Sequence, residues 1–79
     1  MKAVENGIVE QSVLYGSTSA EVLGCYTIST LCGKYLVEVK DFVHGVMHLF
    51  GMYGRYDDAA RRVGRYYENV LMYGRIGGC

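Results

Sequence analysis

The chain of 79 residues is about half apolar (51%) and has no formal net charge, with eight basic and eight acidic residues. This composition excludes an intrinsically disordered chain, and the balanced charge lacks the basic footprint of a protein that coats nucleic acid or membranes. At this length we expect one small domain spanning residues 1–74, with residues 75–79 as a flexible C-terminal tail.

The first third of the chain supports two interpretations. Gly16, followed by the capping-box sequence TSAE at 18–21, predicts the end of one helix over roughly residues 2–15 and the start of another. Against this, the segment GCYTIST at 24–30 is rich in β-branched and aromatic residues, which favour strands. The segments GSTS and CGK would then be turns of a three-stranded meander that ends in KYLVEV.

Between Lys34 and Tyr53, apolar residues recur at helical spacing, and the polar residues Lys34, Glu38, Asp41 and His48 follow the same period on the opposite side. This pattern predicts an amphipathic helix. The apolar positions are Leu36, Val39, Phe42, Val43, Val46, Leu49, Phe50 and Tyr53.

A second helix is predicted to begin near Tyr56, where Asp57 and Asp58 suit the positive end of a helix dipole, and to stop at Gly74. The predicted fold class is therefore all-α, a small bundle of three or four helices. The alternative is an α+β fold, with an N-terminal three-stranded antiparallel meander followed by two helices.

The cysteines predict a reducing environment. Cys25, Cys32 and Cys79 are an odd number without a CxxC pair, unlike the even and dense set of a secreted disulfide scaffold. MKAVENG lacks the apolar segment of a signal peptide, and the longest uncharged run, Val22 to Gly33, falls short of the ~20 residues of a spanning helix. We expect a cytoplasmic protein without a membrane partner, in which Cys25 and Cys32 are small buried hydrophobes.

One stretch, DFVHGVMHLFGMYGR at 41–55, has the spacing of a metal site. On a helix, Asp41, His44 and His48 would share one side, and two histidines four apart can bind zinc. The glutamate of the HExxH hydrolase motif is absent. The same three residues also complete the solvated side of the predicted helix, and we favour that interpretation, with no metal and no cofactor.

A second stretch, RYDDAARRVGRYY at 55–67, interleaves arginine with tyrosine, as protein interfaces do. Arg61, Arg62, Arg65 and Tyr66 would alternatively contact phosphates and stack on bases of a nucleic acid. However, Asp57 and Asp58 stand four residues before Arg61 and Arg62, where ion pairs cancel basic character.

These features favour a non-enzymatic protein–protein interaction module that binds a protein partner and self-associates, with a homodimer as the first candidate. Its size is typical of accessory or inhibitor proteins of phages and mobile elements. An enzyme is disfavoured, because the cysteines lie in an apolar segment and the glycines form no phosphate-binding loop. A nucleic-acid-binding regulator and a metal-binding helical protein are the alternatives. The predicted partner-binding residues are Tyr53, Tyr56, Arg61, Arg65, Tyr66 and Tyr73.

Overall fold

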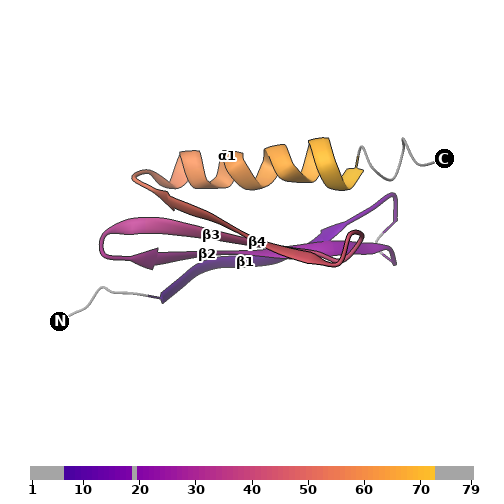
Figure 1. Cartoon of the computed structure of the whole chain (residues 1–79), viewed down its shortest axis with the longest axis horizontal. Coiled ribbons are helices and arrows are strands. Elements are labelled where there is room, and N and C mark those ends of the chain that lie inside the picture. Colours follow the sequence, from indigo (N-terminus) through magenta and orange to yellow (C-terminus); the bar gives the residue numbers. More distant parts are fainter. Residues whose placement is uncertain (1–6, 19, 73–79) are drawn as a thin grey trace.

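The computed structural model describes residues 7–18 and 20–72, which form a four-stranded antiparallel sheet with one helix packed on one face (Figure 1). Each strand pairs with its neighbour in sequence, so β1 and β4 are the edges of the sheet. The elements are β1 (Gly7–Tyr15), β2 (Val22–Leu31), β3 (Lys34–Asp41), β4 (Val46–Tyr53) and α1 (Tyr56–Tyr66), which continues as the π-helical turns η1 (Tyr67–Met72).

Short turns with glycines at positive φ connect the later strands. Cys32 (φ 54°) and Gly33 (φ 78°) form the two-residue link between β2 and β3, in which two positive φ angles match the twist of the flanking strands. Residues 42–45 link β3 to β4, and Gly45 takes a φ of 71° at the end of that turn. There the Gly45 amide donates to the Asp41 carbonyl at 2.9 Å.

The prediction of an all-α bundle is wrong, and so is the predicted helix from Lys34 to Tyr53, which is a β-hairpin. In β3 the buried residues Val37, Val39 and Asp41 alternate, as a strand requires. Apolar residues on the other face of the sheet, such as Leu36 and Leu49, obscured that alternation and imitated helical spacing. The α+β alternative shares the antiparallel meander but lacks β4, which it assigned to a helix.

The C-terminal helix does form, and α1 begins at Tyr56 with Asp57 and Asp58 in its first turn. Its predicted stop at Gly74, the domain boundary at residue 74 and the tail at 75–79 lie outside the described residues. None of the helical turns within residues 7–18 and 20–72 has the length and apolar character that a bilayer-spanning helix needs.

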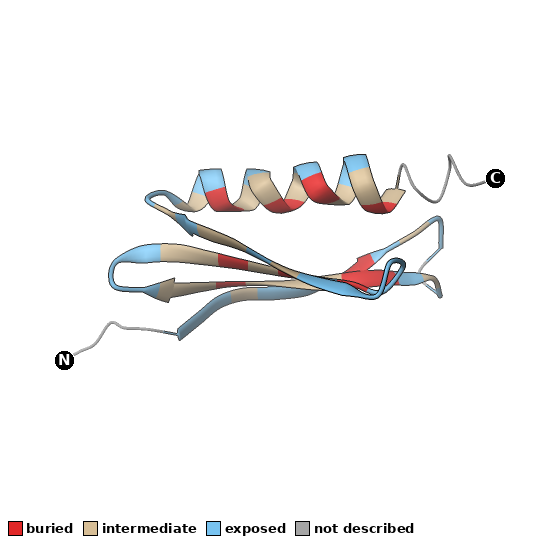
Figure 2. Cartoon of the chain, in the orientation of Figure 1, coloured by how far each residue is buried: buried red, intermediate tan, exposed pale blue. Residues whose placement is uncertain are grey.

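The core lies between α1 and the face of the sheet that the helix covers, as the buried positions on both show (Figure 2). Ile28, Val37, Val39 and Leu71 are fully or almost fully buried, and burying each such side chain stabilises the fold by roughly 1.5–3 kcal/mol. The remaining buried apolar residues are Leu14, Leu23, Ala59, Val63 and Tyr66.

Candidate functional site

The first candidate feature is the face of the sheet opposite α1. Strand register places three rungs of side chains on it, and among the described residues no element covers them (Figures 1 and 2). We call this the uncovered face. Its rungs are Val13, Cys25, Lys40 and Met47; Gln11, Thr27, Glu38 and Leu49; and Ile8, Ser29, Leu36 and Met52.

The uncovered face is apolar at its margins and charged at its centre. Ile8 on β1 is 63% exposed, and Met47 and Leu49 on β4 are 59% and 64% exposed. Glu38 and Lys40 lie on adjacent rungs of the central strand β3, each flanked by uncharged neighbours on β2 and β4. An uncharged row on β1 (Val13, Gln11 and Ile8) and an apolar row on β4 (Met47, Leu49 and Met52) therefore flank one acidic and one basic group.

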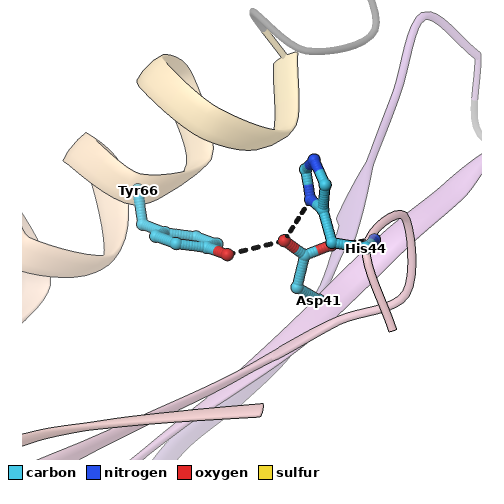
Figure 3. Close-up of polar contacts among 3 residues, drawn as sticks. All are labelled: Asp41, His44 and Tyr66. Atoms are coloured by element: carbon cyan, nitrogen blue, oxygen red, sulfur yellow. Dashed lines mark hydrogen bonds and ion pairs between the residues drawn. The ribbon is translucent and has the colours of Figure 1, made fainter. Parts of the chain in front are cut away.

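A second feature is the buried carboxylate of Asp41, whose side chain has no exposed surface (Figure 3). Its oxygens accept hydrogen bonds from the Tyr66 hydroxyl at 2.5 Å and the His44 backbone amide at 2.9 Å, and His44 Nδ1 lies 2.6 Å away. Burial would raise the pKa of Asp41, but the hydrogen bonds from Tyr66 and His44 outweigh burial and lower it. Burial and the hydrogen bond to Asp41 raise the pKa of Tyr66 to about 12.

This cluster joins three elements of the fold. Asp41 closes the turn after β3 through His44 and attaches α1 to the sheet through Tyr66. Within the described residues, His44 has no hydrogen-bonded hydroxyl or thiol that it could activate as a nucleophile.

Asp41, His44 and His48 lie in β3, a turn and β4, and not on a helix. The predicted metal site and the predicted solvated helix side both required that helix, so neither arrangement is present. His48 stacks on Phe50 at 5.4 Å and meets the Tyr66 ring at 5.1 Å, so of the two histidines it is His44 that contacts Asp41. Across residues 7–18 and 20–72, no three His, Cys, Asp or Glu side chains are grouped to hold a metal ion.

A third feature is a hollow of about 250 Å³ between α1 and the end of β4, which we call the arginine hollow. Three of the six predicted partner-binding residues, Tyr53, Arg61 and Arg65, line it. Asp58 and Arg62 complete the lining.

The other predicted partner-binding residues lie elsewhere. Tyr66 is buried and donates its hydroxyl to Asp41, so neither a protein partner nor a nucleic-acid base reaches its ring face. Tyr56 is half-buried, and its hydroxyl donates to Glu10 on β1. Tyr73 falls outside the described residues.

Tyrosine hydroxyls attach the helix to the sheet at several points. Tyr26 and Tyr56 both donate to the Glu10 carboxylate, and these hydrogen bonds lower the pKa of Glu10. Tyr67 donates to the Tyr15 carbonyl at 2.5 Å. Tyr56 and Tyr66, two of the predicted partner-binding residues, thus hold α1 on the sheet.

The cysteines also differ from expectation. Cys32 is exposed in the β2–β3 turn, and Cys25 is half-buried on the uncovered face, so neither is a buried core residue. The Cys25 thiol is free.

The uncovered face was not predicted from the sequence, because residues 34–53 were predicted to form a helix. The signal was present in KYLVEVKD, where Tyr35, Val37 and Val39 alternate with Leu36, Glu38 and Lys40. Gly33 and Gly45 bracket that strand and its turn, and they are the residues that positive φ angles favour.

No protein-family model, no curated protein and no solved structure matches this chain.

Proposed function

We propose that this protein is a non-enzymatic protein-binding module that docks a second copy of itself through the uncovered face. The observation that supports this proposal is the exposure of large apolar residues on a regular sheet face opposite the helix. Exposed apolar side chains gathered on one face are typical of protein interaction sites, whereas scattered single residues are not.

The size of the face fits a small dimer interface. Four strands about 4.8 Å apart and about eight residues long at about 3.3 Å per residue give roughly 500 Å². Two such faces bury roughly 1,000 Å² when they meet, which is at the lower limit of specific protein interfaces. A dimer that exchanges with monomer is therefore expected, rather than an obligate one.

The charges favour an identical partner. A two-fold axis that crosses the strands between the rungs of Glu38 and Lys40 places each Glu38 opposite Lys40 of the second copy. Because the symmetry repeats the contact, one acid and one base on each chain form two ion pairs. Leu49 and Met47, the neighbours of Glu38 and Lys40 on β4, would then shield these pairs from water.

The experiment is sedimentation-velocity analysis across a dilution series. Leu49→Lys places a charge at the margin of the uncovered face and should shift the protein to monomer. Val46→Lys is the matched control, because Val46 is also exposed on β4 but is paired with Asp41, on the helix side of the sheet. A wild-type protein that is monomeric at every concentration, or equal dissociation by both variants, would overturn the proposal.

The free thiol of Cys25 supports the cytoplasmic location that we propose for this module, because oxidising compartments favour disulfides.

A further inference from the structure

We propose that the arginine hollow binds the carboxylates of a short acidic segment of a partner protein. This site is separate from the uncovered face and does not depend on self-association. Its lining brings Arg61, Arg62 and Arg65 from α1 together with Tyr53 from β4. At about 250 Å³, the hollow is smaller than the pockets that hold drug-sized ligands, so it suits side-chain groups.

The hollow carries positive charge that the protein leaves largely unneutralised. Three guanidinium groups face one carboxylate, that of Asp58, which lies 3.7 Å from Arg61 and is therefore too far for a good hydrogen bond. Among the described residues, no carboxylate lies within 4 Å of Arg62 or Arg65. An acidic group entering the hollow would complement this charge.

One of the three arginines is already held in place. The guanidinium carbon of Arg62 lies 4.1 Å from the centre of the Phe50 ring, in a cation–π contact. Phe50 is itself packed against Tyr66 and His48. Because an ordered guanidinium loses less freedom on binding, its fork of donors is prepared for bidentate contact with a carboxylate.

A nucleic acid fits the hollow less well than an acidic peptide. The chain has no net charge to attract a polyanion, and Asp57 and Asp58 lie beside the arginines on α1. Tyr66, which would have stacked on a base, is buried with its hydroxyl on Asp41. One or two carboxylates can enter the hollow, whereas a continuous phosphate backbone would also pass Asp57 and Asp58 and be repelled by them.

A second hollow carries no such signal. A hollow of about 200 Å³ on the opposite side of α1 is lined mainly by apolar residues, including Leu14, Ile28 and Val63. Its carboxylate, Glu10, already accepts hydrogen bonds from Tyr26 and Tyr56. Unmet charge is therefore found at the arginine hollow and not at this second hollow.

The test is fluorescence anisotropy of a labelled hexaglutamate peptide with the full chain, and hexaglutamine serves as the uncharged control peptide. Arg65→Ala should weaken hexaglutamate binding about tenfold or more, because it removes charged hydrogen bonds to the peptide. Arg65→Lys should recover only part of that loss, since lysine keeps the charge without the bidentate fork. Arg55→Ala is the matched control, as Arg55 is an exposed arginine that does not line the hollow.

Three outcomes would overturn this proposal: no binding of hexaglutamate, equal binding of hexaglutamine, or equal losses in Arg55→Ala and Arg65→Ala. Competition by mixed-sequence single-stranded DNA at lower concentration than unlabelled hexaglutamate would also overturn it, in favour of nucleic acid. Leu49→Lys should leave hexaglutamate binding unchanged, so that failure of the dimer and failure of this site remain distinguishable. Unchanged thermal melting of Arg65→Ala confirms that its effect is on binding.

Discussion

Replacing Tyr66 with phenylalanine removes one hydroxyl and leaves the ring packed against His48 and Phe50. The hydroxyl donates at 2.5 Å to a carboxylate with no exposed surface, so water cannot readily replace it. A hydrogen bond to a buried charged group contributes about 1.5–3 kcal/mol. A domain of this length has a free energy of unfolding of roughly 4–12 kcal/mol, so Tyr66→Phe removes a substantial part of it.

The assay is thermal and urea unfolding followed by circular dichroism. A loss of about 2 kcal/mol should lower the Tm by roughly 8–16 °C in a domain of this size. Tyr35→Phe is the matched control, because the Tyr35 hydroxyl has no hydrogen bond among the described residues while its ring contacts Tyr56. We expect this control to change the free energy of unfolding by less than about 0.5 kcal/mol.

A double-mutant cycle isolates the contact itself. Once Asp41 is replaced by asparagine, Tyr66→Phe should cost about 1 kcal/mol less than in the wild-type protein, because no buried charge remains to lose its donor. Equal losses in Tyr66→Phe and Tyr35→Phe would refute the reasoning. It would mean that Asp41 does not attach the helix to the sheet.

Two further predictions concern acid stability and the core. Because the folded-state pKa of Asp41 is lowered, the stability that its ionisation contributes is present above about pH 4 and is lost as the pH falls through the folded-state pKa. Asp41→Asn should therefore flatten the acid limb of stability against pH in urea titrations, and an unchanged limb would contradict the cause assigned to this pKa. Leu71→Ala should cost about 2–5 kcal/mol in urea unfolding, since Leu71 in η1 has no exposed surface, and a loss below 1 kcal/mol would show that η1 does not pack as described.

The helix was predictable from sequence, but the hairpin before it was not. Asp57 and Asp58 mark the start of α1. The helix buries only the side that packs on the sheet, so its apolar residues follow a simple helical period. In β3 and β4, Leu36 and Leu49 are apolar although they lie on the uncovered face, so polar and apolar residues do not alternate cleanly. A pattern derived from burial fails where apolar residues stay exposed.

The arginine hollow, too, was predictable from the sequence only in part. The mixture of arginine and tyrosine predicted an interaction surface, and Tyr53, Arg61 and Arg65 do lie together. Sequence could not show that Tyr66 points into the core, because its partner Asp41 is 25 positions away in the chain. The sequence also could not show that Glu38 and Lys40 lie on adjacent rungs of one face, because those rungs depend on strand register.

The central claim, an identical partner at the uncovered face, is tested most directly by reversing its charges. Glu38→Lys places lysine at both positions of the proposed pair, and Lys40→Glu places glutamate at both, so each variant alone should repel its own copy and sediment as a monomer. Mixed in equal amounts, the two variants should form a heterodimer that native mass spectrometry resolves. A mixture that stays monomeric while the wild-type protein dimerises would contradict the proposed pairing of Glu38 with Lys40 of the second copy.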